Sequence, residues 1–508
     1  MTNRNYAVVI VLLAWCLQAS SQQAAAPEEP ALTIYNANFA VVRQTIPLDL
    51  KAGTNRVNFT DATAHIEPDS VILRDPSGQR TLQILEQNYR NDPISQELLL
   101  SLNEGKTIDF QVQHVDAQGQ VHTEIVQGKI IRSGYVSHDY SMYQYEQYQQ
   151  AADARSSQPI IEVNGRLQFT LPGQPLFPTL GEGTILKPTL NWVLQTDKGG
   201  SSTAELSYVT GGMNWHADYN VVAPPKGDTL ELVGWITMAN QSGKEFDNAR
   251  IKLMAGDVNK IQPPGDYQYA ARVASYARQA PGQPPVTEKA FDEYHLYTLE
   301  RPATLHDREI KQVEFVSAMG IKAQRLYVYN GAAIGDQYAY YAYEQIRNDQ
   351  NYGTESNPKV WVMQEFKNSK TNNLGMPLPK GRLRFYRRDD DGQMEFTGEN
   401  TIDHTPADEI IRVKTGNAFD IVGERRRTNY KIDTDHDFLD ESFEIKLRNH
   451  KKEAVEVRVV EKLYRWTNWE IQQKSDDYNK MDSQSVEFRV QVPPDTEKVV
   501  TYTVHYTW

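Results

Sequence analysis

The chain has 508 residues, which at roughly 100 to 200 residues per domain corresponds to about three or four folded units. Lys and Arg total 53 while Asp and Glu total 66, and the resulting net charge of −13 argues against nucleic acid as a partner. The single cysteine, Cys16, lies in an N-terminal apolar stretch. A chain cleaved after that stretch has no thiol for a disulfide, a cysteine zinc site or a cysteine nucleophile.

The N-terminus has the pattern of a secretory signal peptide. Arg4 precedes an apolar run of about ten residues, and small residues follow at 19–21. The run is too short for the roughly 20 residues of a membrane-spanning helix, which argues against a membrane anchor. We therefore predict a signal peptide at residues 1–21 and action in the periplasm or at the surface of a bacterial cell. Acylation at Cys16 is the alternative, but bulky Trp15 stands where lipoprotein processing needs a small residue.

From Ala31 onward, short runs of alternating apolar and polar residues are separated by Gly, Pro, Asn and Asp, which is typical of β-structure. Residues 30–95 are predicted to form an N-terminal β-sandwich-like domain. Residues 96–133 read as a small hairpin module around the turn at 116–119, with partner strands that the sequence does not reveal. The overall expectation is an all-β fold with several immunoglobulin-like sandwich units in tandem, the hairpin module and long loops.

A Tyr- and Gln-rich linker is expected at residues 134–158, either as an aromatic platform for glycan or protein binding or as an extended loop, which we favour. Asn164-Gly165 lies between alternating apolar runs and predicts a type I′ hairpin turn, because both turn residues need positive φ.

The central β domain is expected at residues 159–429. Its predicted strands lie at 189–196, 203–210, 217–222, 229–238 and 249–254. A Pro-rich insertion at 262–287 interrupts them, with a possible short helix at 270–277, and a second Tyr-rich loop runs from 336 to 352.

Residues 430–508 are expected to form a C-terminal immunoglobulin-like domain. One internal echo supports repeated sandwiches: the stretch 236–240 with 249–253 resembles 445–449 with 455–459. Each pair is a strand, a polar turn and a returning strand. The alternation common to all β-strands explains this similarity equally well.

No sequence motif identifies a catalytic site. The chain has no Gly-x-Ser-x-Gly elbow, no His-Glu-x-x-His, no P-loop and no Gly-x-Gly-x-x-Gly after a strand. We therefore predict no enzymatic activity and assign no catalytic, cofactor-binding or metal-ligating residue.

Asp433, Asp435 and Asp437 are the best metal candidates, because oxygen ligands at alternate positions suit Ca²⁺, with Glu444 at the twelfth place of such a loop. Phe438 stands where a calcium loop requires Gly, however, so an acidic, solvated lead-in to a strand is the preferred interpretation. The run Asp389-Asp390-Asp391-Gly392 is interpreted as a hairpin turn.

Two further clusters have a functional and a structural interpretation. The triplet at residues 425–427 is three arginines that could grip an anion, although solvated or ion-paired side chains are more typical of such a strand. Trp215-His216 beside Asp218-Tyr219 could contact a ligand, but a Trp-capped sandwich edge is favoured.

The last residues alternate strictly and end in Trp508, as do the last strands of outer-membrane barrels. Earlier strands are short and show no regular lipid-facing array, so we favour a final immunoglobulin-like strand and keep the outer-membrane β-barrel as a second alternative.

Several blocks resemble a bacterial envelope family known only as domain of unknown function 4139. They are residues 206–219, 253–259, 375–381, 402–406, 419–425 and 444–450, in that order, and the similarity spans about 160–508. Residues 31–75 resemble, less specifically, the family's N-terminal strand domain. Some relatives, called mucoidy inhibitor A, carry a coiled coil between the two parts, whereas this chain has the hairpin module and the Tyr-rich stretch.

The resemblance implies a secreted, β-rich protein and supplies no activity, cofactor or site residue. The expected function is that of a non-enzymatic envelope scaffold or binding module, with an envelope protein or a surface polysaccharide as partner and without a transmembrane helix in the mature chain. A glycan-binding or glycan-hydrolysing surface protein that uses the Tyr-rich loops is the alternative.

Overall fold

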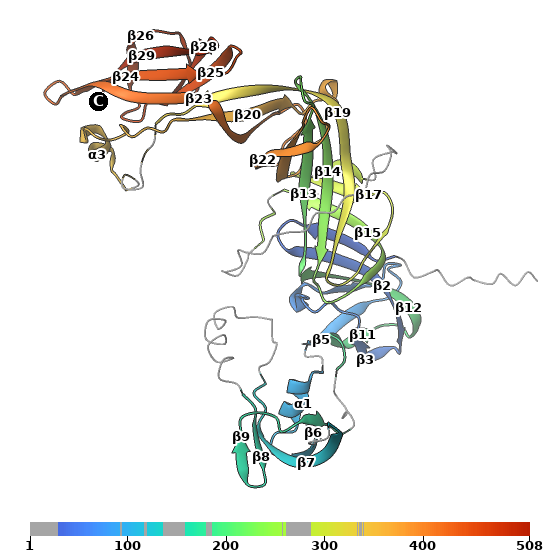
Figure 1. The fold of residues 1–508 in the computed structure, drawn as a ribbon. Coiled ribbons are helices and arrows are strands. Elements are labelled where there is room, and N and C mark those ends of the chain that lie inside the picture. Colours follow the sequence, from blue (N-terminus) through green and yellow to red (C-terminus); the bar gives the residue numbers. More distant parts are fainter. Residues whose placement is uncertain are drawn as a thin grey trace, which may run out of the picture.

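The computed structural model describes residues 29–91, 94–115, 119–135, 158–178, 185–256, 258–260, 286–332, 334, 338 and 340–508. Within these residues the chain is all-β, as predicted, with four sheets and short helices (Figure 1). The predicted signal peptide, most of the first Tyr-rich stretch and nearly all of the Pro-rich insertion lie outside them. None of the helices found in this described part is long and apolar enough to cross a membrane.

The N-terminal strands form two sheets with strands from much later in the chain. The larger sheet contains β1 (Ala31–Tyr35), β2 (Phe39–Leu50), β4 (Ile72–Arg74), β12 (Gly200–Gly211), β15 (Phe246–Ala255), β16 (Val286–Phe291), β17 (Tyr294–Leu299) and β18 (Ala303–Leu305). The smaller contains β3 (Gly53–Phe59), β11 (Thr189–Thr196) and β5 (Leu82–Arg90), and a 3-10 turn, η1, spans Pro68–Ser70.

Pairing in these sheets crosses the boundary that the sequence places near residue 95. β12 pairs with β2 along its whole length, and β15 runs parallel to β1. The N-terminal and central strands also share one hydrophobic core, in which Ile34 and Leu206 are fully buried. Alternation of apolar and polar residues identifies a strand but not its partner, and β2 and β12 are 150 or more residues apart. This is why the strand pairing does not follow the domain boundary predicted near residue 95.

A small module is inserted between β5 and β11. The two strands pair to their ends at Arg90 and Thr189, and the Ile94 N–H donates to the Ile185 carbonyl at 3.1 Å. The module contains α1 (Gln96–Leu102), β6 (Thr107–Val115), β7 (Val121–Arg132), β8 (Ile160–Val163), β9 (Arg166–Gln168) and β10 (Gln174–Leu176). β8 and β10 are the partner strands that the predicted hairpin of residues 106–132 lacked.

The module has its own core and a confirmed turn. Leu100 of α1 packs on one face of the sheet with Ile108, Phe110, Ile130, Ile161 and Val163. Asn164 and Gly165 have φ of 49° and 73° and join the paired residues Val163 and Arg166, which confirms the predicted two-residue turn.

The largest sheet runs through the central and C-terminal parts. Its order is β22 (Met394–Ile402), β21 (Gly381–Arg388), β13 (Met213–Ala223), β14 (Thr229–Asn240), β19 (Glu309–Tyr329), β20 (Lys359–Lys367), β23 (Ile410–Asp433), β24 (Phe438–Asn449), β29 (Thr496–Thr507) and β26 (Trp469–Lys474). β25 (Val455–Lys462), β28 (Ser485–Val492) and β27 (Tyr478–Lys480) join it through β19. The short helices α3 (Tyr343–Asn348) and η5 (Lys370–Asn372) flank β20.

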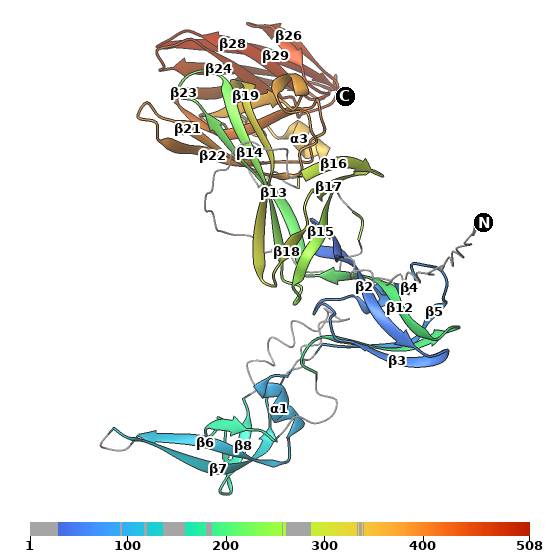
Figure 2. The ribbon, with the colours of Figure 1, turned by 90° about the vertical axis from the view of Figure 1, so that its right-hand side faces the viewer.

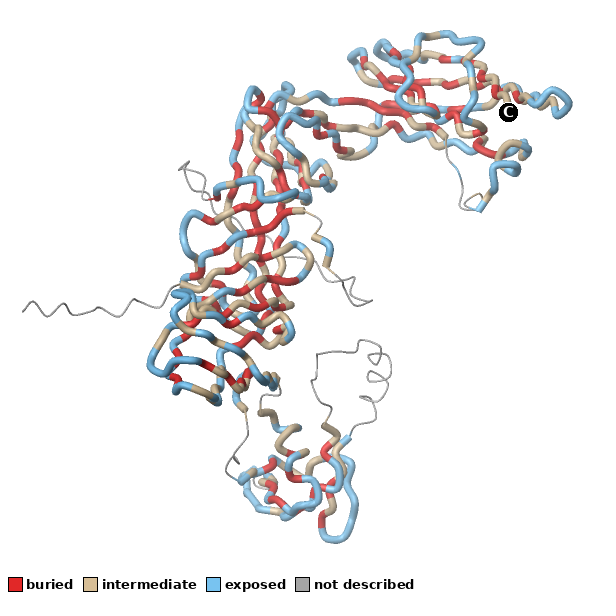
Figure 3. The backbone as a smooth tube through the Cα atoms, turned by 180° about the vertical axis from the view of Figure 1, so that it is seen from behind, coloured by how far each residue is buried: buried red, intermediate tan, exposed pale blue. Residues whose placement is uncertain are grey.

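Two long strands make the body elongated. β19 pairs with β14 through its first half and with β20 through its second, and β23 passes in the same way from β20 to β24. Figures 1 and 2 show the result: the module lies at one end and the C-terminal strands lie at the other. In Figure 3 buried segments recur along the whole length of the body and alternate with intermediate and exposed ones, and a smaller group lies in the module.

An asparagine clasp recurs three times along this body. The side-chain amide of Asn240, the last residue of β14, donates to the carbonyls of Leu305 and His306 at 3.2 and 3.1 Å. Asn449, the last residue of β24, donates in the same way to Val492 and Pro493 at 3.1 and 3.0 Å.

These shared hydrogen bonds support the internal similarity between residues 236–253 and 445–459. A third asparagine, which the sequence similarity did not reveal, makes the same bonds. Asn368, after β20, donates to the carbonyl of Pro406 at 2.9 Å and to that of Thr405 at 3.5 Å. In each copy the clasp ties a strand end to the crossover before the strand that pairs with it, so one local hydrogen-bond motif recurs at three strand ends of the body.

Candidate functional site

The Trp215 cluster splits between the two faces of β13. The indole N–H of Trp215 donates to the Met254 carbonyl at 3.1 Å, and the Tyr219 hydroxyl donates to the Pro379 carbonyl at 2.7 Å. Both rings are buried in the core. These two residues therefore have a packing role, but β13 lies inside the sheet between β21 and β14, not at the sandwich edge that the sequence favoured.

Asp218 lies on the opposite face of β13 and is also buried, at 6% exposure. One carboxylate oxygen is 3.1 Å from the His216 Nε2, and the other is 3.4 Å from Arg382 on the neighbouring strand. Burial raises the pKa of Asp218, but the hydrogen bond and charge of His216 and the nearby arginines outweigh it, so the pKa is below its usual value. The Thr237 hydroxyl donates to this carboxylate at 3.2 Å. The cluster ties β13, β14 and β21 together by charge.

The acidic candidates for calcium form a turn between β23 and β24. Asp433 accepts backbone N–H bonds from Asp435 and His436, both at 3.1 Å, and Asp437 has a positive φ of 53°. Glu444 is 3.0 Å from Arg426 on the paired strand. In the part of the chain that the structure describes, no group of three His, Cys, Asp or Glu side chains is arranged to hold a metal ion.

The Asp389–Gly392 stretch is the predicted hairpin turn. The Gly392 N–H donates to the Asp389 carbonyl at 3.0 Å, and Asp389 bonds across the turn to Gln393 at 2.8 Å. Its carboxylates cap backbone N–H groups of the same turn, as Asp391 does for Gln393 at 2.9 Å.

The arginine triplet is ion-paired, as the preferred interpretation holds, and Arg425 is also buried. Its Nε lies 2.9 Å from Glu461, and both side chains are almost fully buried. The Tyr502 hydroxyl donates to the same glutamate at 2.6 Å. Burial lowers the pKa of Arg425, but the charge of Glu461 outweighs it and the pKa is raised.

A second buried pair lies beside the first. Arg465 is 2.9 Å from Glu441, and Arg427 is 3.2 Å from the same carboxylate. Sequence reasoning missed Arg465, Glu441 and Glu461, because their partners come from different strands and each residue alone has the pattern of an ordinary strand residue.

These buried arginines anchor the segment 340–358, which we call the strap. Arg465 donates to the carbonyls of Asp349 and Tyr352 at 2.7 and 3.0 Å. Arg425 and the Tyr464 hydroxyl both donate to the Gly353 carbonyl at 2.8 Å. The strap contains most of the second Tyr-rich loop, whose backbone is therefore bound to the C-terminal strands.

The aromatic residues of the strap divide into an inner and an outer set. Tyr352 is 6% exposed and its ring centroid lies 5.1 Å from that of Tyr338 and 5.2 Å from that of Tyr464. Burial raises the pKa of Tyr464 to about 12. This inner set is part of the packing and is not the exposed binding surface that the glycan alternative envisaged.

In the outer set Tyr343 is exposed, whereas Arg347 is partly buried and Trp466 and Trp508 are partly buried against the C-terminal core. Tyr343, Arg347, Trp466 and Trp508 form a cluster that we call the platform. Tyr343 is 70% exposed and meets Trp466 edge to face at 5.9 Å between ring centroids. The Arg347 guanidinium lies 4.7 Å from the Trp466 ring centroid and 5.0 Å from that of Trp508.

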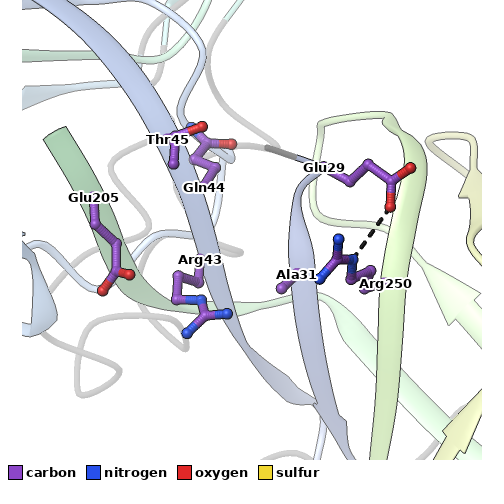
Figure 4. A pocket seen from close by; sticks show the side chains of 7 residues that line it. All are labelled: Glu29, Ala31, Arg43, Gln44, Thr45, Glu205 and Arg250. Atoms are coloured by element: carbon purple, nitrogen blue, oxygen red, sulfur yellow. Dashed lines mark hydrogen bonds and ion pairs between the residues drawn. The ribbon is translucent and has the colours of Figure 1, made fainter. Parts of the chain in front are cut away.

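Two hollows lie beside β2. The first is a shallow polar dent, shown in Figure 4, lined by Glu29, Ala31, Arg43, Gln44, Thr45, Glu205 and Arg250. Arg250 is engaged there by Glu29 at 3.3 Å. The second is an open groove with Ile46, Leu48 and Phe246 among its lining residues. Its Lys244 bonds to Asp61 and Gln44, so these cations already have partners within the protein.

The module presents an open sheet face. Five apolar side chains on it are 39 to 69% exposed: Val115, Val121, Ile125, Leu167 and Leu176. The pairing puts all five on this face, with Val115 opposite Val121 at the hairpin end. The other three lie among polar residues: Ile125 is opposite Gln111, Leu167 opposite Glu162 and Leu176 opposite Asp109. The other face carries the module core, so this one has no partner element within the described residues.

A family profile described as domain of unknown function (DUF4139) matches residues 204–508. No curated protein and no solved structure matches the chain. The matched range contains the Asp218 cluster, the three clasps, the strap and the platform. The inserted module lies before the matched range.

Proposed function

The chain belongs to the DUF4139 family, and from this premise we propose that it is a secreted, non-enzymatic protein of the bacterial envelope that serves as a scaffold or binding module for another envelope protein. The observation that carries the proposal is the open face of the module. Exposed apolar side chains on a sheet face that no other described element covers favour a protein interaction surface.

The place of the module in the fold supports this role. It is inserted at the end of the β5–β11 hairpin, and its core does not include residues of the elongated body. Binding of a partner to the module therefore does not require the packing of the body to change.

The charged clusters support a structural role for the body. The buried carboxylates Asp218, Glu441 and Glu461 are each held by cations on neighbouring strands. A general base or acid needs a proton-accepting group that can reach a substrate, and these carboxylates are committed to the sheet instead.

The test is crosslinking in cells that produce either the intact protein or a variant in which residues 91–188 are replaced by a two-residue type I′ turn. The replacement keeps β5 and β11 paired, because Arg90 and Thr189 already face each other. A tag placed after residue 28 leaves Trp508 unaltered.

We expect the intact protein to capture one envelope protein in stoichiometric amount and the replaced variant to lose it while keeping its melting temperature. Capture of the same protein by both forms would contradict the assignment to the module. Turnover of an envelope polysaccharide by the intact protein, abolished by one Asp or Glu substitution that preserves the fold, would contradict the non-enzymatic role.

A further inference from the structure

We propose that the platform is a second binding site, for an acidic oligosaccharide: Arg347 binds a sugar carboxylate, and the rings of Tyr343, Trp466 and Trp508 contact the sugar faces. The site lies at the opposite end of the molecule from the module (Figures 1 and 2). It goes beyond the scaffold role and stands independently of it.

Arg347 differs from the other arginines of this region in having no anionic partner. Arg425, Arg426 and Arg465 each pair with a glutamate at 3.0 Å or less. Within the described residues Arg347 makes only its two indole contacts, and its Nε is buried without a hydrogen-bond partner. A guanidinium framed by rings and lacking a carboxylate is complementary to a ligand that supplies one.

The surroundings of Arg347 favour a sugar over an apolar protein surface. Two indoles frame the guanidinium, and Tyr343, which packs against one of them, is 70% exposed. The indole of Trp466 is partly exposed and lies next to polar Thr467 and Asn468. Ring faces bordered by hydrogen-bonding groups suit a pyranose, which presents C–H groups on its faces and hydroxyls at its edge.

The strap holds this site in place before any ligand arrives. Tyr343 and Arg347 lie on α3, while the next turns of the strap are fixed by Arg465 at Asp349 and by Arg425 at Gly353. A preordered site loses less conformational entropy on binding. The buried ion pairs therefore have a functional reason: they hold an exposed loop to a rigid sheet.

The net charge of −13 limits the ligand. The negative charge of the protein repels a long polyanion. Salt screens this repulsion beyond the Debye length, which is about 8 Å at physiological ionic strength, so the ligand must be held by direct contacts at the site. A short oligosaccharide with few carboxylates satisfies both conditions.

The test is calorimetric titration of the purified protein at physiological ionic strength with three probes: trigalacturonate, neutral maltotriose and a tri-glutamate peptide. We expect binding of trigalacturonate at least tenfold tighter than that of the other two. Absence of trigalacturonate binding would overturn the proposal. Equal binding of tri-glutamate would assign the site to acidic peptides, and equal binding of maltotriose would remove the role of Arg347.

Two matched pairs of variants sharpen the result. Arg347→Gln should weaken trigalacturonate binding about tenfold or more, as expected for a hydrogen bond between charged groups. Arg388→Gln should leave it within twofold, because Arg388 pairs with Glu231 on the central sheet. Tyr343→Ala should weaken binding severalfold, and Tyr340→Ala, which alters a tyrosine outside the platform, should not. Unchanged binding in Arg347→Gln would overturn the site.

Discussion

The central body and the C-terminal unit differ in how many charged side chains they bury. Six of the seven buried charged residues in the described structure lie between residues 425 and 487: Arg425, Glu441, Arg458, Glu461, Arg465 and Glu487. The seventh, Asp218, is in the central body, whose large core is otherwise apolar or neutral.

The difference follows from what each part holds. The central strands pack sheet against sheet, and burial of apolar surface suffices for that. The C-terminal unit also binds the strap, a loop whose backbone carbonyls need donors that apolar side chains cannot supply. Buried arginines satisfy those carbonyls, and buried glutamates neutralise the arginines. Four of the six, Arg425, Glu441, Glu461 and Arg465, therefore serve the attached loop. Arg458 and Glu487 instead pair with Glu456 and Arg489.

The largest effect is expected from breaking a buried pair. Glu441→Gln leaves Arg465 without its carboxylate in a buried site and should lower the free energy of unfolding by about 3–5 kcal/mol. Urea denaturation of the purified protein measures it. Glu444→Gln is the control, since its pair with exposed Arg426 contributes about 1 kcal/mol or less. Equal effects of the two would show that the buried charges do not hold the unit.

Release of the strap gives the next effect. Gly353 has φ of +70°, and a Cβ there would lie 1.6 Å from the Tyr464 hydroxyl. Gly353→Ala should displace the strap and lower stability by more than the roughly 1–2 kcal/mol of left-handed strain alone. Gly392→Ala, at φ of +86° with no atom within 4 Å, supplies the strain without the clash. Faster proteolysis between residues 340 and 358 in the first variant only is the expected result.

The asparagine clasps should behave alike in both regions. Asn240→Ala and Asn449→Ala each remove the donor from one buried and one part-buried carbonyl hydrogen bond, and each should cost about 1–3 kcal/mol. Thermal unfolding followed by circular dichroism measures both. A large effect at one clasp and none at the other would contradict the recurrence of one local motif.

The single buried charge of the central body should give a smaller, pH-dependent effect. The lowered pKa of Asp218 means that its ionised form stabilises the fold above about pH 4, the ordinary range of an Asp, and that this contribution is lost as pH falls through its folded pKa. Asp218→Asn should therefore be less stable than the wild type by about 1–2 kcal/mol at pH 7, with the gap closing in acid. Urea titrations at pH 7 and pH 3 test the sign.

The smallest effect concerns calcium. The Asp433–Asp437 turn satisfies its own backbone N–H groups, and Glu444 is paired with Arg426. Neither Ca²⁺ nor EDTA should move the melting temperature by more than about 1 °C. A rise of several degrees with Ca²⁺ would restore the calcium interpretation.

Local features were predictable from the sequence. Alternation located strands such as β11 at Thr189–Thr196, and Asn164-Gly165 located its turn, because both depend on neighbours within a few residues. The hairpin interpretation of Asp389–Gly392 depended on the same local chemistry.

Long-range features were not predictable in the same way. The pairing of β12 with β2, and the buried contacts among Arg425, Glu461 and Tyr502, join residues 36 or more positions apart, and no short pattern encodes them. The platform was missed for this reason: Tyr343 and Arg347 lie in the Tyr-rich loop, while their aromatic partners follow more than 100 residues later. The third clasp was missed because the spacing around Asn368 differs from that in the other two copies.

The most direct measurement for the scaffold role is site-specific photo-crosslinking in cells, with the photoreactive residue placed at Ile125 on the open face of the module or at Ile310 on β19. The two side chains are 51% and 66% exposed, so both reach solvent. We predict one crosslinked envelope protein from position 125 and none from position 310. Equal crosslinking from both positions, or none from position 125, would contradict the claim that the open face of the module binds a partner.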